Sequence, residues 1–414
     1  MTDASPATAA RVVIVNDASL ARGGATALAL LSARLIAARG IAVTYVTGDA
    51  GDSPAARALR AGGVEVVALG GARLLEQSAL KSATAGVWNG ATRAMISRVL
   101  AQDTPDTVYH VHGWAQILSP ALFAALAPVA RRTVIHAHDL FLACPNGVYH
   151  DYRADRPCTR TPLGAACLTT NCDKQSYPRK LWRVARQAAL RRALDPRAPW
   201  GRIAMIHPKM APVLERVGHP AARLVTLRNP AEAWADTRIP AEANREILFV
   251  GRVAREKSVD DLCAAARQAG VSLTVVGDGP LRESLSAAYP EVTFAGWQDR
   301  AGIAAHAARA RGLIMPTRAP EPFGLVAAEA SLSGLPVLVA DRALIAEEVS
   351  SGGLGLAFGS GGTPALAAAM TQLIGMPDEK VHQISDRGFS RTAPLAQTPE
   401  AWTDALIDLY GNLL

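Results

Sequence analysis

Short runs of apolar residues recur along the chain, separated by segments long enough to form helices. The first half carries seven such runs: Val12–Val15, Val43–Val46, Val64–Ala68, Val108–Val111, Thr133–His136, Ile203–Ile206 and Leu224–Leu227. The second half carries five: Ile247–Val250, Leu273–Val276, Val292–Ala295, Leu313–Met315 and Val337–Val339. Continuous apolar strands that alternate with helices are typical of a parallel sheet covered on both faces. The pattern therefore predicts two doubly wound α/β domains, with ligands at the carboxyl ends of the strands.

The length of 414 residues also favours two domains, because one ordinary core rarely grows so large. The break is expected near Arg228–Thr237, where Asn229-Pro230 ends a strand and a polar stretch follows. We predict a Rossmann-like domain over residues 1–230 and a second one over residues 231–397. Residues 398–414 read as a terminal helix with Trp402, Leu406, Leu409 and Tyr410 toward one side.

Residues 141–178 fit the strand–helix rhythm poorly and read as an irregular insertion in the first domain. The insertion contains Cys144, Cys158, Cys167 and Cys172, whereas Cys263 falls on an expected core helix. Two interpretations stay open. The four thiols bind a structural zinc ion, although paired Cys-x-x-Cys spacing is missing, or they pack in a loop that shapes a binding site.

Composition narrows the class of protein. We find no targeting segment at the start and no uncharged apolar stretch long enough to span a bilayer, so we expect a cytoplasmic protein. Through Pro230 there are 28 Lys and Arg against 14 Asp and Glu, while the remainder carries 15 against 22. This asymmetry suggests that the first half meets an anionic partner. Nucleic acid is not expected, because no recognition motif accompanies the charge.

Residues 174–192 carry seven basic residues and no acid, with apolar residues interleaved. The segment reads as a basic amphipathic helix. Such a helix either lies on an anionic membrane surface or is an ordinary solvated helix, and the sequence leaves both readings open.

Candidate chemistry begins at Gly251–Ser258, directly after an expected strand. The segment lacks the glycine before the lysine that a phosphate-wrapping P-loop needs, since Glu256 stands there. We read it as a strand–loop–helix connection that places two cations, Arg252 and Lys257, where a diphosphate could bind. Surface charges near a helix start are the alternative if the segment is taken alone.

A second motif runs from Pro316 to Glu329 and contains Glu321-Pro-Phe-Gly-Leu-Val-Ala-Ala-Glu329. Pro322 suits the first position of a helix, so Phe323, Gly324 and Leu325 are expected in its first turn. The unpaired N–H groups of a helix start bind anions, and a glycine there allows close approach. Glu321 and Glu329 would then lie about 12 Å apart along the helix axis, the span of a diphosphate with a sugar at one end and a ribose at the other.

These motifs, in this order, resemble the family-4 retaining glycosyltransferases of GT-B fold, or glycosyl transferases group 1. That family has two glutamates separated by seven residues around Phe-Gly, a Gly-Arg…Lys segment (Gly251, Arg252, Lys257), a Gly-Asp-Gly-Pro turn (Gly277–Pro280) and a Phe-x-Gly turn (Phe294–Gly296). The resemblance runs through most of the chain. It implies two Rossmann-like domains facing a cleft and a C-terminal helix that crosses back to the first domain.

The resemblance also implies roles for single residues. Arg252 and Lys257 would hold the donor diphosphate, helped by the N–H groups of Gly324 and Leu325, next to Phe323. Glu329 would bond the ribose and Glu321 would face the transferred sugar. Trp297 lies where the family holds the nucleobase; packing at a strand end is the alternative.

The first domain is expected to contribute two parts by the same resemblance. Gly23 and Gly24 match a glycine loop close to the donor, and His138 matches a histidine near the reacting sugar. His110, His112 and His136 are nearby in sequence, and a three-histidine zinc site is conceivable. Histidines at strand ends more often satisfy local hydrogen bonds, so we predict no metal there.

The resulting hypothesis is a retaining, metal-independent hexosyltransferase that uses a UDP- or GDP-sugar and needs no cofactor. No Asp-x-Asp sequence occurs, so leaving-group charge would be stabilised by Arg252, Lys257 and the helix start. His138 and Glu321 would position the sugar. The acceptor would be a lipid-linked glycan of a cell-surface polysaccharide. The alternatives are a GT-B-fold epimerase or hydrolase acting on the nucleotide sugar, and a membrane-surface scaffold without activity.

Overall fold

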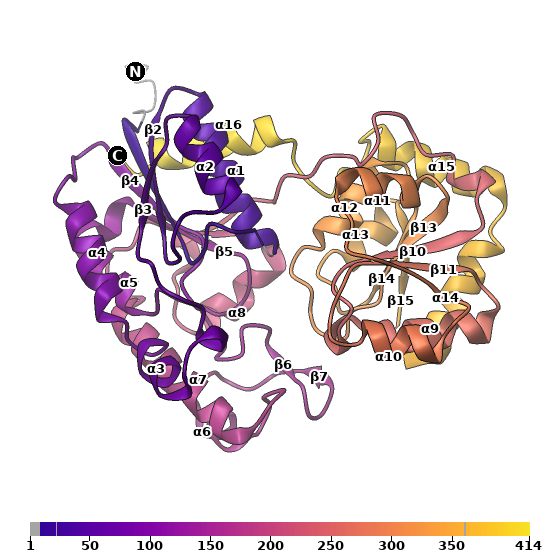
Figure 1. Ribbon diagram of the computed structural model, residues 1–414, viewed down its shortest axis with the longest axis horizontal. Coiled ribbons are helices and arrows are strands. Elements are labelled where there is room, and N and C mark those ends of the chain that lie inside the picture. The colour runs from indigo at the N-terminus through magenta and orange to yellow at the C-terminus, as the bar shows by residue number, and fades with distance from the viewer. Residues whose placement is uncertain (1–8, 22, 360–361) are drawn as a thin grey trace. The chain divides into compact units, whose positions relative to one another are not determined.

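The computed structural model describes residues 9–21, 23–359 and 362–414 and divides the chain into two compact units (Figure 1). The first unit extends to Arg228 and also includes Pro399–Leu414. The second unit spans Asn229–Thr398. Each unit is built on one parallel sheet, which confirms the fold class expected from the alternation of apolar runs and helices.

The first unit contains a seven-stranded sheet in the order β3-β2-β1-β4-β5-β8-β9, with every neighbouring pair parallel. Its strands are β1 (Arg11–Asn16), β2 (Ala42–Thr47), β3 (Glu65–Ala68), β4 (Thr107–Val111), β5 (Thr133–Ala137), β8 (Arg202–Met205) and β9 (Leu224–Thr226). The main helices are α1 (Gly24–Ala38), α2 (Pro54–Ala61), α3 (Ala79–Ala85), α4 (Gly90–Leu100), α5 (Ala121–Leu126), α7 (Tyr177–Ala193) and α8 (Ala211–Arg216). All seven strands coincide with the apolar runs of the sequence. In β1, β4 and β5 the run is continuous because these strands are buried on both faces.

The C-terminal helix α16 (Pro399–Gly411) completes the first unit and packs against α1 (Figure 1). Trp402, Leu406 and Tyr410, spaced four residues apart, lie on one helix face and are 0% exposed. At the surface, Arg39 pairs with Asp404 at 2.5 Å. This is the crossover helix that the sequence led us to expect.

The second unit contains a six-stranded parallel sheet in the order β12-β11-β10-β13-β14-β15. Its strands are β10 (Glu246–Val250), β11 (Leu273–Val276), β12 (Thr293–Gly296), β13 (Ala310–Met315), β14 (Val337–Ala340) and β15 (Gly355–Phe358). Its helices are α9 (Val259–Ala269), α10 (Arg282–Ala288), α11 (Arg300–Ala307), α12 (Leu325–Leu332), α13 (Ala346–Ser351), α14 (Gly362–Ile374) and α15 (Asp378–Phe389). Sequence reasoning missed β15, a short edge strand that begins with a glycine.

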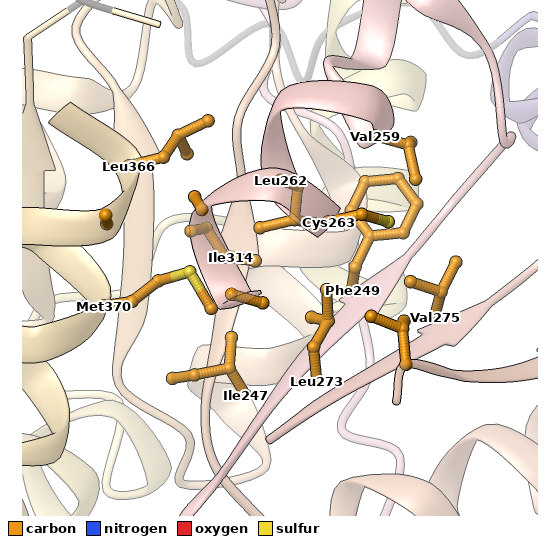
Figure 2. Close-up of a cluster of buried hydrophobic side chains, with 14 of the residues drawn as sticks. Ile247, Phe249, Val259, Leu262, Cys263, Leu273, Val275, Ile314, Leu366 and Met370 are labelled. Carbon is orange, nitrogen blue, oxygen red and sulfur yellow. The ribbon is translucent and has the colours of Figure 1, made fainter. Parts of the chain in front are cut away.

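Figure 2 shows the apolar core that holds β10 and α9 together in the second unit. Val259, Leu262 and Cys263 repeat at helical spacing along α9 and meet Phe249 of β10 and Met370 of α14 within this cluster. Burial of each such side chain contributes about 1.5–3 kcal/mol. The core fixes the point at which β10 ends, and therefore the position of the loop that carries Arg252 and Lys257.

The insertion in the first unit is mostly irregular. It contains a small antiparallel pair, β6 (His150–Asp151) and β7 (Arg156–Pro157), and the short helix α6 (Ala165–Thr169). All four of its cysteines are free and line one small cavity, together with Lys180 of α7. The Lys180 ammonium donates to the carbonyl of Cys167 at 2.8 Å and lies 3.1 Å from the Cys172 sulfur. Two of the four thiols, those of Cys167 and Cys172, therefore contact a buried lysine. The zinc interpretation stays a prediction for metal analysis.

The basic segment 174–192 is only partly a charged surface, contrary to our reading of it as an amphipathic basic face. Lys180 and Arg186 are 1% and 4% exposed, and Arg183 pairs with Asp173 at 2.9 Å. The two buried cations point into the unit because carbonyls and aromatic rings of the insertion and neighbouring loops receive them. Basic residues in a helical pattern look solvated from sequence alone, and only tertiary partners reveal otherwise.

Candidate functional site

The loop after β10 places two cations at the carboxyl end of the second sheet. Gly251 leaves the strand, and Arg255–Lys257 form a single 3-10 turn before α9. Arg252 is exposed and lies 3.6 Å from Glu256. Lys257 is half-buried and forms an ion pair with Glu321, 64 residues away in the sequence. The structure thus brings together the two motifs that the sequence analysis joined only by resemblance.

Three glycine-rich loops pack tightly beside these cations. Gly277 has a φ of +137°, and a Cβ there would lie 1.9 Å from the carbonyl oxygen of Gly251. The Val253 amide donates to the carbonyl of Asp278 at 2.9 Å, and the Gly277 amide donates to that of Gly296 at 2.7 Å. The loops after β10, β11 and β12 are therefore joined backbone to backbone. The contact between the loops is a sufficient reason for glycine at position 277, because a side chain there would collide with the neighbouring backbone.

The segment from Glu321 to Glu329 differs from our expectation. Helix α12 begins at Leu325, and Gly324 is its N-cap residue with a left-handed φ of +75°. Pro322 and Phe323 therefore precede the helix instead of forming its first turn, because a left-handed residue cannot continue a right-handed helix. Glu329 lies about one turn into α12. The predicted spacing of 12 Å along one helix axis is wrong for this reason.

Close packing explains the glycine and the phenylalanine in this motif. A Cβ on Gly324 would lie 2.8 Å from the sulfur of Met315, the last residue of β13. Phe323 is buried, whereas Leu325 is half-buried at the helix start. The first N–H groups of α12 have no acidic side chain in their own turn, so an anion is free to bind there.

Arg318, which sequence reasoning did not single out, fixes the loop after β13 against the loop after β10. Its amide donates to the carbonyl of Glu256 at 3.1 Å, and its guanidinium donates to the carbonyl of Arg255 at 2.7 Å. The guanidinium also pairs with Asp260 and Asp261 of α9. Because it touches both loops that carry the candidate diphosphate ligands, Arg318 sets their separation.

Burial changes the acid–base behaviour of Glu329. Burial raises the pKa of its carboxyl to about 7, and Arg300 of α11, 3.7 Å away, opposes this rise. The carboxyl is therefore poised to change charge near neutral pH. Arg300 was not predicted, because a single arginine at a helix start carries no distinctive signal.

Trp297 follows Gly296 at the end of β12 and is 75% exposed. Its indole is available to stack against a ring. The alternative reading, an aromatic packed at a strand end, is wrong.

The structure places Gly23 and Gly24 at the N-terminus of α1 in the first unit. The residue before them, Arg22, lies outside the described residues. Gly24 is the first residue of the helix, and Gly23 precedes it in an extended conformation. A Cβ on Gly23 would meet no atom within 4 Å, so packing among the described residues does not require a glycine there. The open backbone is consistent with approach of a ligand.

Four histidines form a ladder at the carboxyl ends of β4 and β5 in the first unit: His110 and His136 lie in the strands, and His112 and His138 directly follow them. Hydrogen bonds join His112 Nδ1 to His138 Nε2 at 3.0 Å and His110 Nε2 to His136 Nδ1 at 3.2 Å. His110 Nδ1 also bonds the hydroxyl of Tyr410 on α16 at 2.7 Å. Burial lowers the pKa of His110 and of His138 to about 3, so both rings are neutral.

The ligand atoms of His110, His112 and His136 lie within 4.8 Å of one another, close enough for a metal ion. These rings already bond their neighbours in the ladder, which is the role that the sequence analysis preferred. The absence of a metal at this place stays a prediction.

Comparison with known proteins identifies the second unit. Residues 244–376 match the family described as Glycosyl transferases group 1. Glycogen synthase of Mycobacterium tuberculosis is 30% identical over 179 residues, which is 40% of this chain and 43% of that protein. A GDP-mannose-dependent alpha-mannosyltransferase of the same species is 39% identical over 122 residues, 30% of each chain. The chain spans less than half the length of the curated relatives it matches.

Solved structures match the whole chain in fold. WaaG, a glycosyltransferase involved in lipopolysaccharide biosynthesis, superimposes with a TM-score of 0.67 over 96% of this chain and 99% of its own, at 18% identity. Anabaena HepE in complex with UDP and glucose gives a TM-score of 0.64 over 96% and 98%, at 16% identity. Among the described residues, no helix has both the length and the apolar character needed to cross a bilayer. Residues 244–376 therefore belong to the Glycosyl transferases group 1 family, within a chain of GT-B fold.

Proposed function

We propose that this protein transfers a sugar from a nucleoside-diphosphate sugar to a glycan acceptor, with retention of the anomeric configuration. The observation that carries the proposal is the meeting of Lys257 with Glu321 beside Arg252 and the open start of α12. Cations and free N–H groups bind the diphosphate, while the carboxylates of Glu321 and Glu329 accept hydroxyl groups of the sugar and ribose. Each of these groups lies in the second unit.

The proposed mechanism stabilises the leaving diphosphate by charge. As the glycosidic bond breaks, negative charge grows on the diphosphate, and Arg252, Lys257 and the α12 N–H groups oppose it. Lys257 exchanges its bond to Glu321 for the phosphate, which frees a Glu321 oxygen for the sugar. No bridging metal or cofactor is needed in this scheme, and the diphosphate oxygen accepts the proton of the acceptor.

The relatives suggest two kinds of nucleotide-sugar donor for this protein. HepE binds UDP and glucose, and the mannosyltransferases depend on GDP-mannose, so uridine and guanosine donors are both candidates. Trp297 stacks on the base in either case. Thermal unfolding with UDP, GDP, UDP-glucose and GDP-mannose distinguishes the base and sugar.

The central prediction concerns the two cations. Arg252→Gln and Lys257→Gln are each expected to weaken nucleotide-sugar binding by about 10- to 100-fold, since a hydrogen bond to a charged group is worth about 1.5–3 kcal/mol. Isothermal titration measures the change. Arg255→Gln removes the same charge from the same loop, where the side chain is exposed, and serves as the matched control. Unchanged affinity in both test variants, or an equal loss in the control, rejects the diphosphate site.

Incubating the nucleotide sugar with enzyme and no acceptor tests the type of reaction. A transferase leaves most of the donor intact, whereas an epimerase brings it to an equilibrium mixture of two epimers and a hydrolase consumes it. Proton NMR of the anomeric signals distinguishes these results. With acceptor present, an α-linked donor is expected to give an α-linked product.

The acceptor is proposed to be a lipid-linked glycan at the cytoplasmic face of a membrane. The excess of basic residues in the first half supports this, although α7 offers fewer free cations than the sequence suggested. On α7 the exposed residues include Tyr177, Arg179, Leu181 and Arg192. Sedimentation with anionic vesicles is expected to carry the protein down, and a combined Arg179→Glu, Leu181→Glu, Arg192→Glu variant is expected to stay in solution.

A further inference from the structure

The irregular insertion of the first unit brings its four cysteines to one cavity. One lies between β5 and β6, one follows β7, one lies in α6 and one lies between α6 and α7; they are Cys144, Cys158, Cys167 and Cys172. The cavity has a volume of about 10 Å³, close to the least space that holds one water molecule. All four are free thiols, and three of them are buried. Sulfur atoms from separate segments therefore line a space suited to a single ion.

Cationic N–H groups face three of these sulfurs. The Lys180 ammonium on α7 lies 3.1 Å from the Cys172 sulfur and 3.6 Å from the Cys167 sulfur. The Arg160 guanidinium lies 3.9 Å from the sulfur of Cys158. A cysteine that only fills space packs among apolar groups, because a neutral thiol is a weak hydrogen-bond acceptor. Cationic donors aimed at sulfur instead suit thiolates, which are the form of cysteine that binds metals.

Lys180 is a buried charge that lacks a carboxylate partner. The residue is 1% exposed, and its ammonium also donates to the carbonyls of Cys167 and Thr170 at 2.8 and 3.4 Å. Among the residues that the structure describes, no carboxylate forms an ion pair with this ammonium, whereas Arg160 pairs with Asp151 at 2.9 Å. Buried charges are normally paired. The negative charge that balances Lys180 is therefore expected to come from the sulfurs.

A zinc centre supplies negative charge at this place. Four thiolates around one Zn²⁺ carry a net charge of −2, which the Lys180 ammonium partly offsets. Groups that hydrogen-bond the ligands are a regular part of metal sites, and Lys180 and Arg160 stand where such groups are needed. Thiolate sulfur favours zinc over Mg²⁺ and Ca²⁺, which take oxygen ligands.

Zinc binding requires a movement of the thiols. Within the described part of the chain, no three of the four sulfurs lie within 4.8 Å of one another, unlike the ring nitrogens of the three strand histidines. The Cys144 thiol also donates to the Asn146 side-chain oxygen at 2.9 Å, a bond that a metal would replace. The sulfurs are carried by short elements and irregular loops outside the seven-stranded sheet, so these segments can close around an ion without disturbing that sheet.

We propose that the four thiols of this cavity bind one zinc ion as thiolates, each exchanging its S–H bond for a zinc–sulfur bond and releasing the proton to solvent. Lys180 and Arg160 are positioning residues that donate to ligand sulfurs. With four protein ligands the tetrahedral site is closed, so the ion braces the insertion and takes no part in chemistry. The proposal concerns the first unit and does not depend on the donor site of the second.

The first test measures metal in the wild-type protein, so it does not depend on the folding of any variant. The full chain, purified with a reductant and without a chelator, is expected to contain one zinc ion per chain by plasma mass spectrometry. Titration with Co²⁺ as the probe is expected to show sulfur-to-cobalt charge-transfer absorption. A site made of the strand histidines gives no such absorption. Cobalt uptake without that absorption, or no uptake of either metal, overturns the proposal.

Variants then identify the ligands and the role of the lysine. Cys158→Ser and Cys172→Ser are each expected to lower zinc affinity by at least about tenfold, while Cys263→Ser, at a buried cysteine of the second unit, keeps the zinc. Lys180→Met is expected to lower it by about 10- to 100-fold, and Lys180→Arg, which keeps the charge, by less.

A chelator is expected to make residues 144–172 more sensitive to protease and to leave thermal stabilisation by UDP or GDP unchanged, which separates this site from the donor site. Equal zinc affinity in the Cys158, Cys172 and Cys263 variants, or cleavage of the insertion that does not respond to the chelator, rejects the zinc centre.

Discussion

At the scale of single residues, the donor site depends on glycines that allow backbone segments to touch. Gly277 shows this most clearly, since its missing side chain lets the loop after β11 reach the carbonyl of Gly251. Gly277→Ala is expected to lower the free energy of unfolding by about 3 kcal/mol or more, because the clash involves backbone that cannot rotate away. Denaturant unfolding measures the loss, and nucleotide affinity is expected to fall with it.

Gly270→Ala provides the matched comparison. Gly270 also has a positive φ of +62°, but a Cβ there meets no atom within 4 Å. Its substitution carries only the conformational cost, about 1–2 kcal/mol. Equal losses at the two glycines would contradict the loop-contact explanation.

The raised pKa of Glu329 leads us to expect that donor binding depends on pH. Since its pKa is raised to about 7 by burial, the carboxyl is mostly protonated at pH 6 and mostly ionised at pH 8. If the ionised form accepts the ribose hydroxyls, affinity for the nucleotide sugar rises by up to about 10-fold over this range. Titration calorimetry at several pH values measures the trend, and Glu329→Gln is expected to bind more weakly with a flat pH dependence.

At the scale of elements, the histidine ladder at the carboxyl ends of β4 and β5 links folding to pH. Burial holds the folded pKa of all four rings well below the ordinary 6.5, whereas unfolded histidines titrate near that value. Below pH 6.5 the unfolded state therefore binds more protons, and stability falls as pH falls. Each ring contributes at most about 1.4 kcal/mol per pH unit.

Unfolding of the first unit between pH 7 and pH 5 measures this dependence. His112→Gln is expected to reduce the slope by about one proton, while His306→Gln, on α11 of the second unit, leaves the first unit's slope unchanged. Asp139 works in the opposite direction, because its raised pKa lets the folded state take up a proton near pH 6. A slope in the first unit that His112→Gln does not alter would show that the ladder is not the source.

Elements also show what the sequence could and could not predict. Buried strands such as β1 and β10 were predicted because their apolar runs are continuous, while β15 was missed because Gly355 opens it. That glycine is needed, since a Cβ would lie 1.9 Å from the carbonyl of Val337 on β14. The motif around Glu321 was found from its residue types, but the helix start was misplaced, because the left-handed φ of Gly324 depends on packing against Met315. The contacts of Arg318 are tertiary and left no local pattern.

At the scale of the whole molecule, the two units differ in the number of chain segments that build them. The second unit is one continuous segment, whereas the first needs α16 from the far end of the chain. Deleting residues 399–414 removes three fully buried side chains, worth roughly 5–9 kcal/mol, which is comparable with the total stability of a domain. We expect the first unit to unfold and the second to persist, so that limited proteolysis leaves a fragment close to 229–398.

Asp404→Asn is the control for that deletion. It breaks the surface pair with Arg39 and is expected to cost no more than about 1 kcal/mol. Leu406→Ala, an intermediate case, is expected to cost about 2–5 kcal/mol, all of it in the unfolding of the first unit. Simultaneous loss of both units after the deletion would contradict their independence.

The place of α16 has a consequence for the order of events during synthesis. The ribosome releases β1 early, yet Tyr410, which bonds His110 beneath the first sheet, emerges roughly three hundred residues after its partner. The second unit, made in between, can finish folding while the first still exposes the surface that Trp402 and Leu406 will cover. We therefore expect the half of the protein that is made first to be the half that completes its fold last.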